Sequence, residues 1–147
     1  MQVFVPYPSP IDEAKCLDKR RLRKQIIECD QILAAIGGKS EAWKNHPIVK
    51  MYSAYWPWLA YYRGTLDAYL QRNIKEAEQC SWNARYACIE PPFLTSDFCD
   101  QHKRRLYTKA PELYPQFAVY GKSEENWYVV NEELLKYVNG RRIIRNT

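Results

Sequence analysis

Apolar residues recur along this chain at helical spacing, and the spacing predicts where the longer helices lie. In the first clear case, five apolar residues follow one another at steps of four, three, four and three: Leu22, Ile26, Cys29, Leu33 and Ile36. Such a stripe is one face of a helix that packs on a core. Asp18 is placed to cap this helix, and Gly37 with Gly38 is placed to end it.

A longer helical pattern runs from Pro47 to about Arg72. Its face is formed by seven apolar or tyrosine residues: Ile48, Met51, Tyr55, Leu59, Tyr62, Leu66 and Tyr69. Pro57 removes one backbone donor, so we expect a kink or a split in this helix. Trp56 and Tyr61 fall off the centre of the stripe and are the better candidates for a binding surface.

A third pattern follows Thr95 or Ser96, either of which can cap a helix that runs to about Thr108. Its apolar side carries four residues: Phe98, Cys99, His102 and Leu106. A lone histidine on such a side is more often a hydrogen-bonded core residue than a catalyst. We therefore expect His102 in the core, with Lys103 and Arg104 exposed.

Shorter elements complete the prediction of an all-α fold. Short helices or turns are expected at four places: from Pro10 after a capping Ser9, at 75–80, at 111–117 and at 132–138. A short strand at 3–5 is the one β element predicted. The chain has no internal repeat and no long linker, so residues 1–147 are expected to form a single compact helical domain.

Charge is segregated along the chain, although the net charge is only +5. Five of the six residues at 19–24 are basic. Two further basic groups are Lys103, Arg104 and Arg105 with Lys109, and Arg141, Arg142 and Arg145. Segregated positive charge favours a polyanion such as DNA as partner, while solvated helix faces are the alternative.

Several classes of protein are excluded by missing features. The N-terminus has no secretory signal and no apolar run is long enough for a bilayer, so the five cysteines are expected as reduced thiols in the cytoplasm, without a membrane partner. No Walker, GxGxxG, GxSxG or HExxH motif is present. Cys80, Cys88, Cys99 and His102 match no compact zinc spacing, so neither a metal nor another cofactor is predicted.

The basic helix near residue 20 carries the first candidate site. Arg21, Gln25 and Glu28 are spaced i, i+4, i+7 and share one face at the edge of the apolar stripe. Arg21 and Lys24 can hold a phosphate, and Gln25 can read a base edge or a sugar. Glu28, a carboxylate among cations, suits acid–base catalysis or an ion pair that orients a neighbour. The alternative is an ordinary surface helix with helical ion pairs.

The second candidate site is Asn45-His46-Pro47. Proline keeps the preceding His46 out of helical geometry, so both side chains lie at a helix start, where donors suit a phosphate or a polar substrate. His46 is therefore a candidate catalytic residue and Asn45 a candidate binding residue. The alternative is plain capping, with His46 packed on Trp43.

Several of these motifs together resemble the pyrimidine-dimer DNA glycosylases of the endonuclease V type and related short phage and bacterial proteins. The resemblance spans residues 1 to about 117 and rests on MQVFVPYP at 1–8, CLD at 16–18, RL at 21–22, KQ at 24–25, NHP at 45–47, PPFL at 91–94 and KAPELY at 109–114. It implies a compact helical fold that binds duplex DNA and flips a base.

The hallmark groups of those glycosylases are absent at the matching positions. The family uses the amine of an N-terminal threonine, assisted by a glutamate on the first long helix. Here Gln2 stands at the first position and Arg21 at the second, while Arg20 and Lys24 match basic positions that contact DNA. The resemblance therefore implies DNA binding more strongly than lesion cleavage.

These observations lead to one main hypothesis and two alternatives. The main one is a cytoplasmic DNA-binding protein (in the host cytoplasm if phage-encoded) that resembles a DNA glycosylase/lyase and acts on a damaged or modified base. Glu28 and His46 are its candidate catalytic residues, and its candidate DNA contacts are Arg20, Arg21, Lys24, Gln25, Asn45, Lys103, Arg104 and Arg105. The alternatives are a phage-type protein that binds a host protein, and an enzyme that acts on a free nucleotide.

Overall fold

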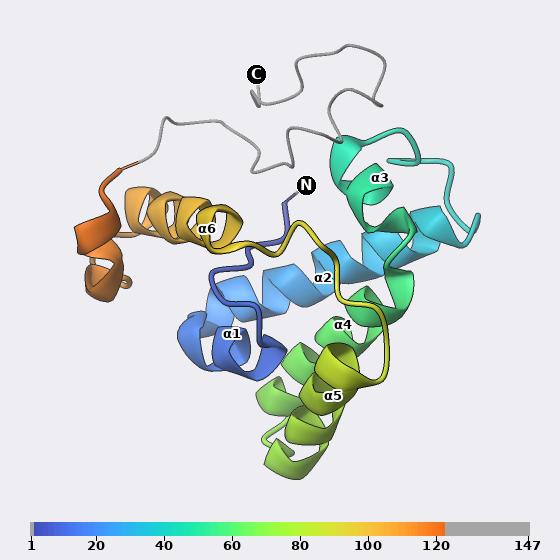
Figure 1. Cartoon of the computed structure of the whole chain (residues 1–147), viewed down its shortest axis with the longest axis horizontal. Helices are drawn as coiled ribbons and strands as arrows, with labels where there is room; N and C mark the ends of the chain where they lie inside the picture. Colours follow the sequence, from blue (N-terminus) through green and yellow to red (C-terminus); the bar gives the residue numbers. More distant parts are fainter. Residues whose placement is uncertain (1, 123–147) are drawn as a thin grey trace.

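The computed structural model describes residues 2–122, which form six α-helices, one 3-10 helix and no strand (Figure 1). The helices are α1 (Pro10–Cys16), α2 (Lys19–Ile36), α3 (Pro47–Ser53), α4 (Trp56–Leu70), α5 (Ile74–Tyr86), α6 (Ser96–Lys109) and the 3-10 helix η1 (Pro115–Tyr120). The all-α prediction is confirmed. The predicted helix at 132–138 and the basic group Arg141, Arg142 and Arg145 lie outside the described residues. None of the described helices is long and apolar enough to cross a membrane.

Local signals fix the ends of the longer helices as predicted. The Asp18 carboxylate accepts a hydrogen bond from the Arg21 amide at the start of α2, and the helix ends at Gly37. Thr95 caps α6 by accepting from the Phe98 amide at 3.2 Å. The prediction for Ser9 is only half right, because α1 does start at Pro10 but the serine side chain makes no capping bond.

Pro57 splits the predicted long helix, as expected, into α3 and α4. The break falls at Ala54 and Tyr55, and Pro57 then occupies the first turn of α4, where its missing N–H is not needed. The next helix is longer than the predicted 75–80, since α5 begins after the capping Asn73 and continues to Tyr86.

The core is built around α4, which packs on α2 and α5. The rings of Trp58 and Tyr62 stack with centroids 5.0 Å apart, and the rings of Tyr52 and Trp58 stack at 6.1 Å. All three side chains are fully buried. These three aromatic side chains therefore pack the interior, whereas Trp56 and Tyr61, the candidates for a binding surface, are exposed.

The N-terminal segment, residues 2–8, belongs to no helix or strand and passes between α2 and α6 (Figure 1). Val3 and Val5 are buried, while the intervening Phe4 lies edge-on to His102 of α6 at 6.0 Å. The expected strand at 3–5 is wrong, because the segment pairs with a helix side chain instead of a neighbouring strand. The N-terminal segment covers one side of the core.

Candidate nucleic-acid interface

Gln25 of α2 holds the N-terminal segment in place. Its Nε2 donates to the Phe4 carbonyl at 2.6 Å, and its Oε1 accepts from the Phe4 amide at 2.8 Å. The side chain is only 2% exposed. The expectation that Gln25 reads a base edge is therefore corrected: its amide is buried and its polar atoms are bonded inside the protein.

A buried carboxyl group lies beside this contact. The Tyr62 hydroxyl bonds to Gln25, to the Phe4 carbonyl and to Glu13 of α1. Burial raises the pKa of Glu13 well above its ordinary value, although the bond from Tyr62 opposes this. The residue was not singled out from the sequence, but the signal was there: a carboxylate occupies a position on the apolar face of α1 beside Ala14.

His102 lies on the other side of the N-terminal segment, fully buried between the rings of Phe4 and Phe98. Burial lowers the pKa of His102 to about 3, and the positive charge of Arg105 contributes. The prediction of a core histidine is confirmed. Its expected hydrogen bond is not found, because neither ring nitrogen has a hydrogen-bonding partner within residues 2–122.

Cations of α2 and α6 influence one another electrostatically. Burial lowers the pKa of Lys109, and three nearby positive charges lower it further: Arg105, Arg21 and Lys24. We call these four residues the α2–α6 basic cluster. Like charges brought this close leave a field that favours an anion. Three of the eight predicted DNA contacts are thus brought together, and Lys109 joins them.

Asp18 and Tyr114 hold the side chain of Arg21, whereas Arg20 and Lys24 are exposed. Arg21 Nη1 lies 3.2 Å from Asp18 Oδ1, and its guanidinium is 5.8 Å from the centroid of the Tyr114 ring. The Tyr114 hydroxyl also bonds to Asp18. Arg20 and Lys24 are exposed on α2, and either can reach a phosphate without breaking an internal contact.

Lys103 and Arg104 differ from the prediction of exposed DNA contacts. Lys103 Nζ bonds to Asp100 and lies over the rings of Tyr7 and Tyr120, at 5.0 and 4.8 Å. Arg104 Nε donates to the Tyr120 carbonyl at 2.8 Å. Both side chains fasten the N-terminal segment or η1 onto α6. Arg105 is also buried, at 7% exposed, so its charge acts from within the protein.

Glu28 is partly buried one turn after Gln25. Its Oε2 is buried and has no hydrogen-bonding partner in the described part of the chain. A carboxylate oxygen in that condition is costly unless a proton, a cation or a ligand donor satisfies it. Of the ionisable groups predicted for catalysis, Glu28 is the one placed on the same helix face as the α2 cations.

His46 caps α3, since its Nδ1 accepts from the Ile48 amide at 3.1 Å and its ring lies against Trp43 at 5.8 Å. This is the capping alternative that the sequence left open. Burial lowers the pKa of His46 to about 4, so the ring is neutral at pH 7. With Nδ1 accepting, Nε2 carries the proton and can only donate. The neighbouring Asn45 is exposed.

The thiols form no metal site in the part of the chain that the structure describes. Residues 2–122 contain no group of three or more histidine, cysteine, aspartate or glutamate side chains that could hold an ion. Burial raises the pKa of all five cysteines, to about 12 for Cys16 and Cys99. Each thiol therefore stays protonated at pH 7 and is a weak nucleophile.

The comparisons with known proteins agree with the resemblance seen in the sequence. A family model described as pyrimidine dimer DNA glycosylase matches residues 1–81, which include the N-terminal segment and α1 to α4. No curated protein and no solved structure matches the chain. The α6 part of the basic cluster lies beyond the matched region. Because the match covers more than half of the sequence, this chain belongs to the pyrimidine dimer DNA glycosylase family.

Proposed function

We propose that this protein binds duplex DNA and cleaves the base–sugar bond of a damaged or modified nucleotide. The observation that carries the proposal is the α2–α6 basic cluster, in which the charges of Arg105, Arg21 and Lys24 lower the pKa of Lys109 while Lys24 and Lys109 stay exposed. Such a cluster suits a phosphate backbone, because each phosphate contact by lysine or arginine releases a counterion and strengthens binding. Arg20, Lys24 and Lys109 make the phosphate contacts.

Glu28 is the residue that we assign to chemistry. We propose water as the nucleophile, because Gln2 stands where the resemblance places the threonine whose amine attacks the sugar. Glu28 takes a proton from that water while the oxygen of the water bonds to C1′ of the sugar. The C1′–N bond breaks, and its electron pair leaves with the base. The unpartnered Oε2 of Glu28 is the supporting observation. Arg21 adds a further phosphate contact from the same helix.

DNA binding is tested with labelled duplex, plain and ultraviolet-irradiated, across a salt series. The triple variant Arg20→Ala, Arg21→Ala and Lys24→Ala is expected to bind more weakly and with a flatter salt dependence. Lys75→Ala, an exposed lysine on α5, is the matched control and should bind as the wild type does. Equal binding by the triple variant and the control would remove this surface from the proposal.

Cleavage is tested on the same samples by gel, after treatment that breaks the strand at abasic sites. Glu28→Gln should abolish product while retaining duplex affinity, because it keeps the side-chain shape and removes the base. If the wild type binds but releases no base from any damaged duplex, the chain is a recognition protein without catalysis. Cleavage retained in Glu28→Gln would assign the chemistry to another group.

A second candidate function, binding to a host protein, is supported by the exposure of Trp56 and Tyr61, which are 53% and 37% exposed. Trp56 borders an apolar depression of about 540 Å³ that Leu33, Ile36 and Ala60 also line. An exposed tryptophan beside apolar surface is typical of protein interfaces. A pull-down from bacterial lysate with nuclease treatment tests this alternative. A partner that survives nuclease and is lost in Trp56→Ala favours a host-protein ligand over DNA.

A further inference from the structure

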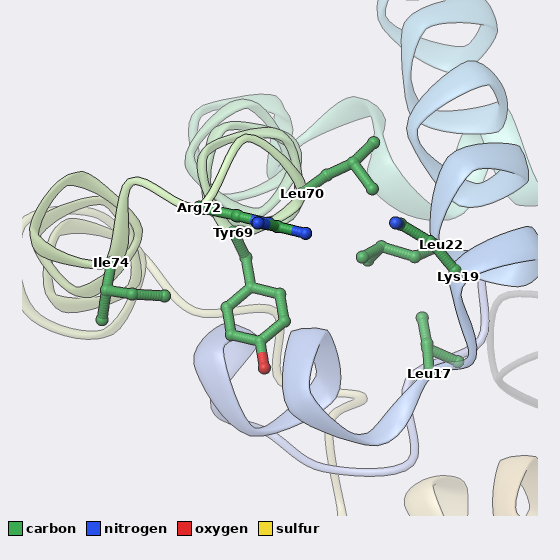
Figure 2. Close-up of a pocket in the computed structure, with 7 residues that line it drawn as sticks. All are labelled: Leu17, Lys19, Leu22, Tyr69, Leu70, Arg72 and Ile74. Atoms are coloured by element: carbon green, nitrogen blue, oxygen red, sulfur yellow. The ribbon is translucent and has the colours of Figure 1, made fainter.

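A second pocket, of about 310 Å³, opens between the start of α2, the end of α4 and the start of α5 (Figure 2). It is lined by Leu17, Lys19, Leu22, Tyr69, Leu70, Arg72 and Ile74. None of these residues belongs to the α2–α6 basic cluster or to the N-terminal segment. The volume is at the lower end of the range for small-molecule sites, roughly 300–1,000 Å³.

The charged side chains that line this pocket are both cations. Figure 2 shows the Arg72 guanidinium and the Lys19 ammonium turned toward one another across it. Neither makes an ion pair with a carboxylate of residues 2–122. Two facing cations repel each other, and an anion placed between them satisfies both with charge-assisted hydrogen bonds.

The backbone at Arg72 holds its side chain at the pocket at a cost. Arg72 has φ 64°, the left-handed conformation that glycine adopts most easily. The surrounding bonds, from the Arg72 amide to Tyr69 and from the Asn73 amide to Ala68, are those of a helix end at which glycine is usual. A glycine would fold here with less strain, but it would bring no cation to the pocket.

The remaining lining is apolar and suits a flat, uncharged body. Leu17, Leu22 and Leu70 form one side, and Ile74, which is 45% exposed, forms part of the rim. The Tyr69 ring lies between these residues in Figure 2. A ligand that fits must therefore combine an anionic end with a ring of about the size of a nucleobase.

We propose that this pocket binds a nucleoside monophosphate, with the phosphate between Lys19 and Arg72 and the base against Tyr69, Leu70 and Ile74. This goes beyond the proposed DNA interface, because the pocket is built by a different edge of α2 and by α4 and α5. The same chemistry has two sources. One is a free mononucleotide, and the other is a terminal nucleotide of a DNA strand held on the protein.

The probe is 2′-deoxyadenosine 5′-monophosphate, titrated into the full-length chain and followed by calorimetry and by amide chemical shifts. Arg72→Gly and Lys19→Gln should each weaken its binding about tenfold or more, since each removes a charged hydrogen-bond donor. Arg72→Gly fits the left-handed backbone, so it should fold at least as stably as the wild type. Lys39→Gln, an exposed lysine outside this pocket, is the matched control.

Two smaller probes divide the pocket into its parts. Deoxyadenosine and inorganic phosphate should each bind more weakly than the complete nucleotide. The proposal is overturned if the wild type does not bind the nucleotide at millimolar concentration. It is also overturned if Arg72→Gly and Lys19→Gln bind the nucleotide as tightly as the wild type does. Inorganic phosphate that binds as tightly as the nucleotide also overturns it, because the apolar wall then has no role.

The source is decided with 5′-phosphorylated DNA. If both variants lose mononucleotide binding but bind DNA as the wild type does, the ligand is a free nucleotide. If they also lose affinity for the DNA end, and mononucleotide competes with that end, the ligand is a terminal nucleotide. Either result supports the pocket. Neither depends on base release, so the pocket and the proposed glycosylase activity succeed or fail separately.

Discussion

Gln25 pairs through its side-chain amide with both main-chain polar groups of Phe4, at 2.6 and 2.8 Å. This is the bonding pattern that a neighbouring strand would supply, here supplied by one residue of a helix. It satisfies a buried stretch of extended backbone that has no strand beside it. The relationship sets the path of the N-terminal segment over α2.

We expect Gln25→Leu to lower the free energy of unfolding by about 2–4 kcal/mol. The substitution keeps the volume but leaves the Phe4 amide without a partner, at about 1–3 kcal/mol, and removes one bond to the Phe4 carbonyl, at about 1 kcal/mol. The carbonyl keeps its bond from the Tyr62 hydroxyl. Urea unfolding measures the change. Gln31→Leu, at an exposed position of the same helix, is the control and should change stability by less than about 0.5 kcal/mol. Equal stability of the two variants contradicts the anchoring role.

Glu13 predicts a loss of stability with rising pH. Burial raises its pKa in the folded state above the ordinary value of 4.5. Its contribution is therefore present below about pH 4.5 and is lost as pH rises toward the folded-state pKa, by up to about 1.4 kcal/mol per pH unit. Glu13→Gln, which stays neutral, should gain on the wild type between pH 5 and 8 in urea unfolding. Parallel pH curves for the two proteins would show that Glu13 is not desolvated.

We expect the buried His102 to make the protein less stable as pH falls, which is the opposite of the effect of Glu13. Its pKa is lowered from 6.5 to about 3, so the unfolded chain binds more protons between those values. The contribution of His102 is present above pH 6.5 and is lost as pH falls toward about 3, by up to about 1.4 kcal/mol per unit. His102→Leu should therefore become more stable relative to the wild type from pH 7 to 5. A constant difference across this range would contradict burial of the neutral ring.

Lys109 predicts that α6 takes part in DNA binding. We expect Lys109→Gln to weaken duplex binding at low salt and to lower the slope of log K against log salt by about one, as the loss of one phosphate contact does. Fluorescence anisotropy in a salt series measures both. Lys75→Gln should leave the slope unchanged. A slope for Lys109→Gln that equals the wild-type slope restricts the interface to α2.

His46 allows capping to be separated from chemistry. His46→Ala should lower stability by about 1 kcal/mol, because the Ile48 amide loses its acceptor. His46→Asn should restore most of that loss, since asparagine is a favourable cap. Thermal unfolding at pH 7 tests both variants. Base release by the stable His46→Asn protein then reports on the imidazole alone, and an unchanged rate would leave His46 with capping only.

The sequence alone determined α2, the division between α3 and α4, and the start of α6, but not the end of α5. The apolar stripe from Leu22 predicted α2, Asp18 and Gly37 bounded it, and Pro57 divided α3 from α4. It also placed His102 in the core, because its neighbours at helical spacing are apolar. These features depend on residues within a few turns of one another, so periodicity and capping chemistry suffice to find them.

The tertiary structure decided which polar residues at the edges of those stripes are buried. Gln25 and Lys103 both lie at such an edge. A side chain there faces water unless another segment of the chain packs over it. The N-terminal segment and η1 pack there and take both side chains out of the predicted interface. The influence of Arg21 and Lys24 on Lys109 likewise depends on how α6 is placed relative to α2. Periodicity along one helix carries no information about which distant segment covers its edge, so only the packed chain could supply these answers.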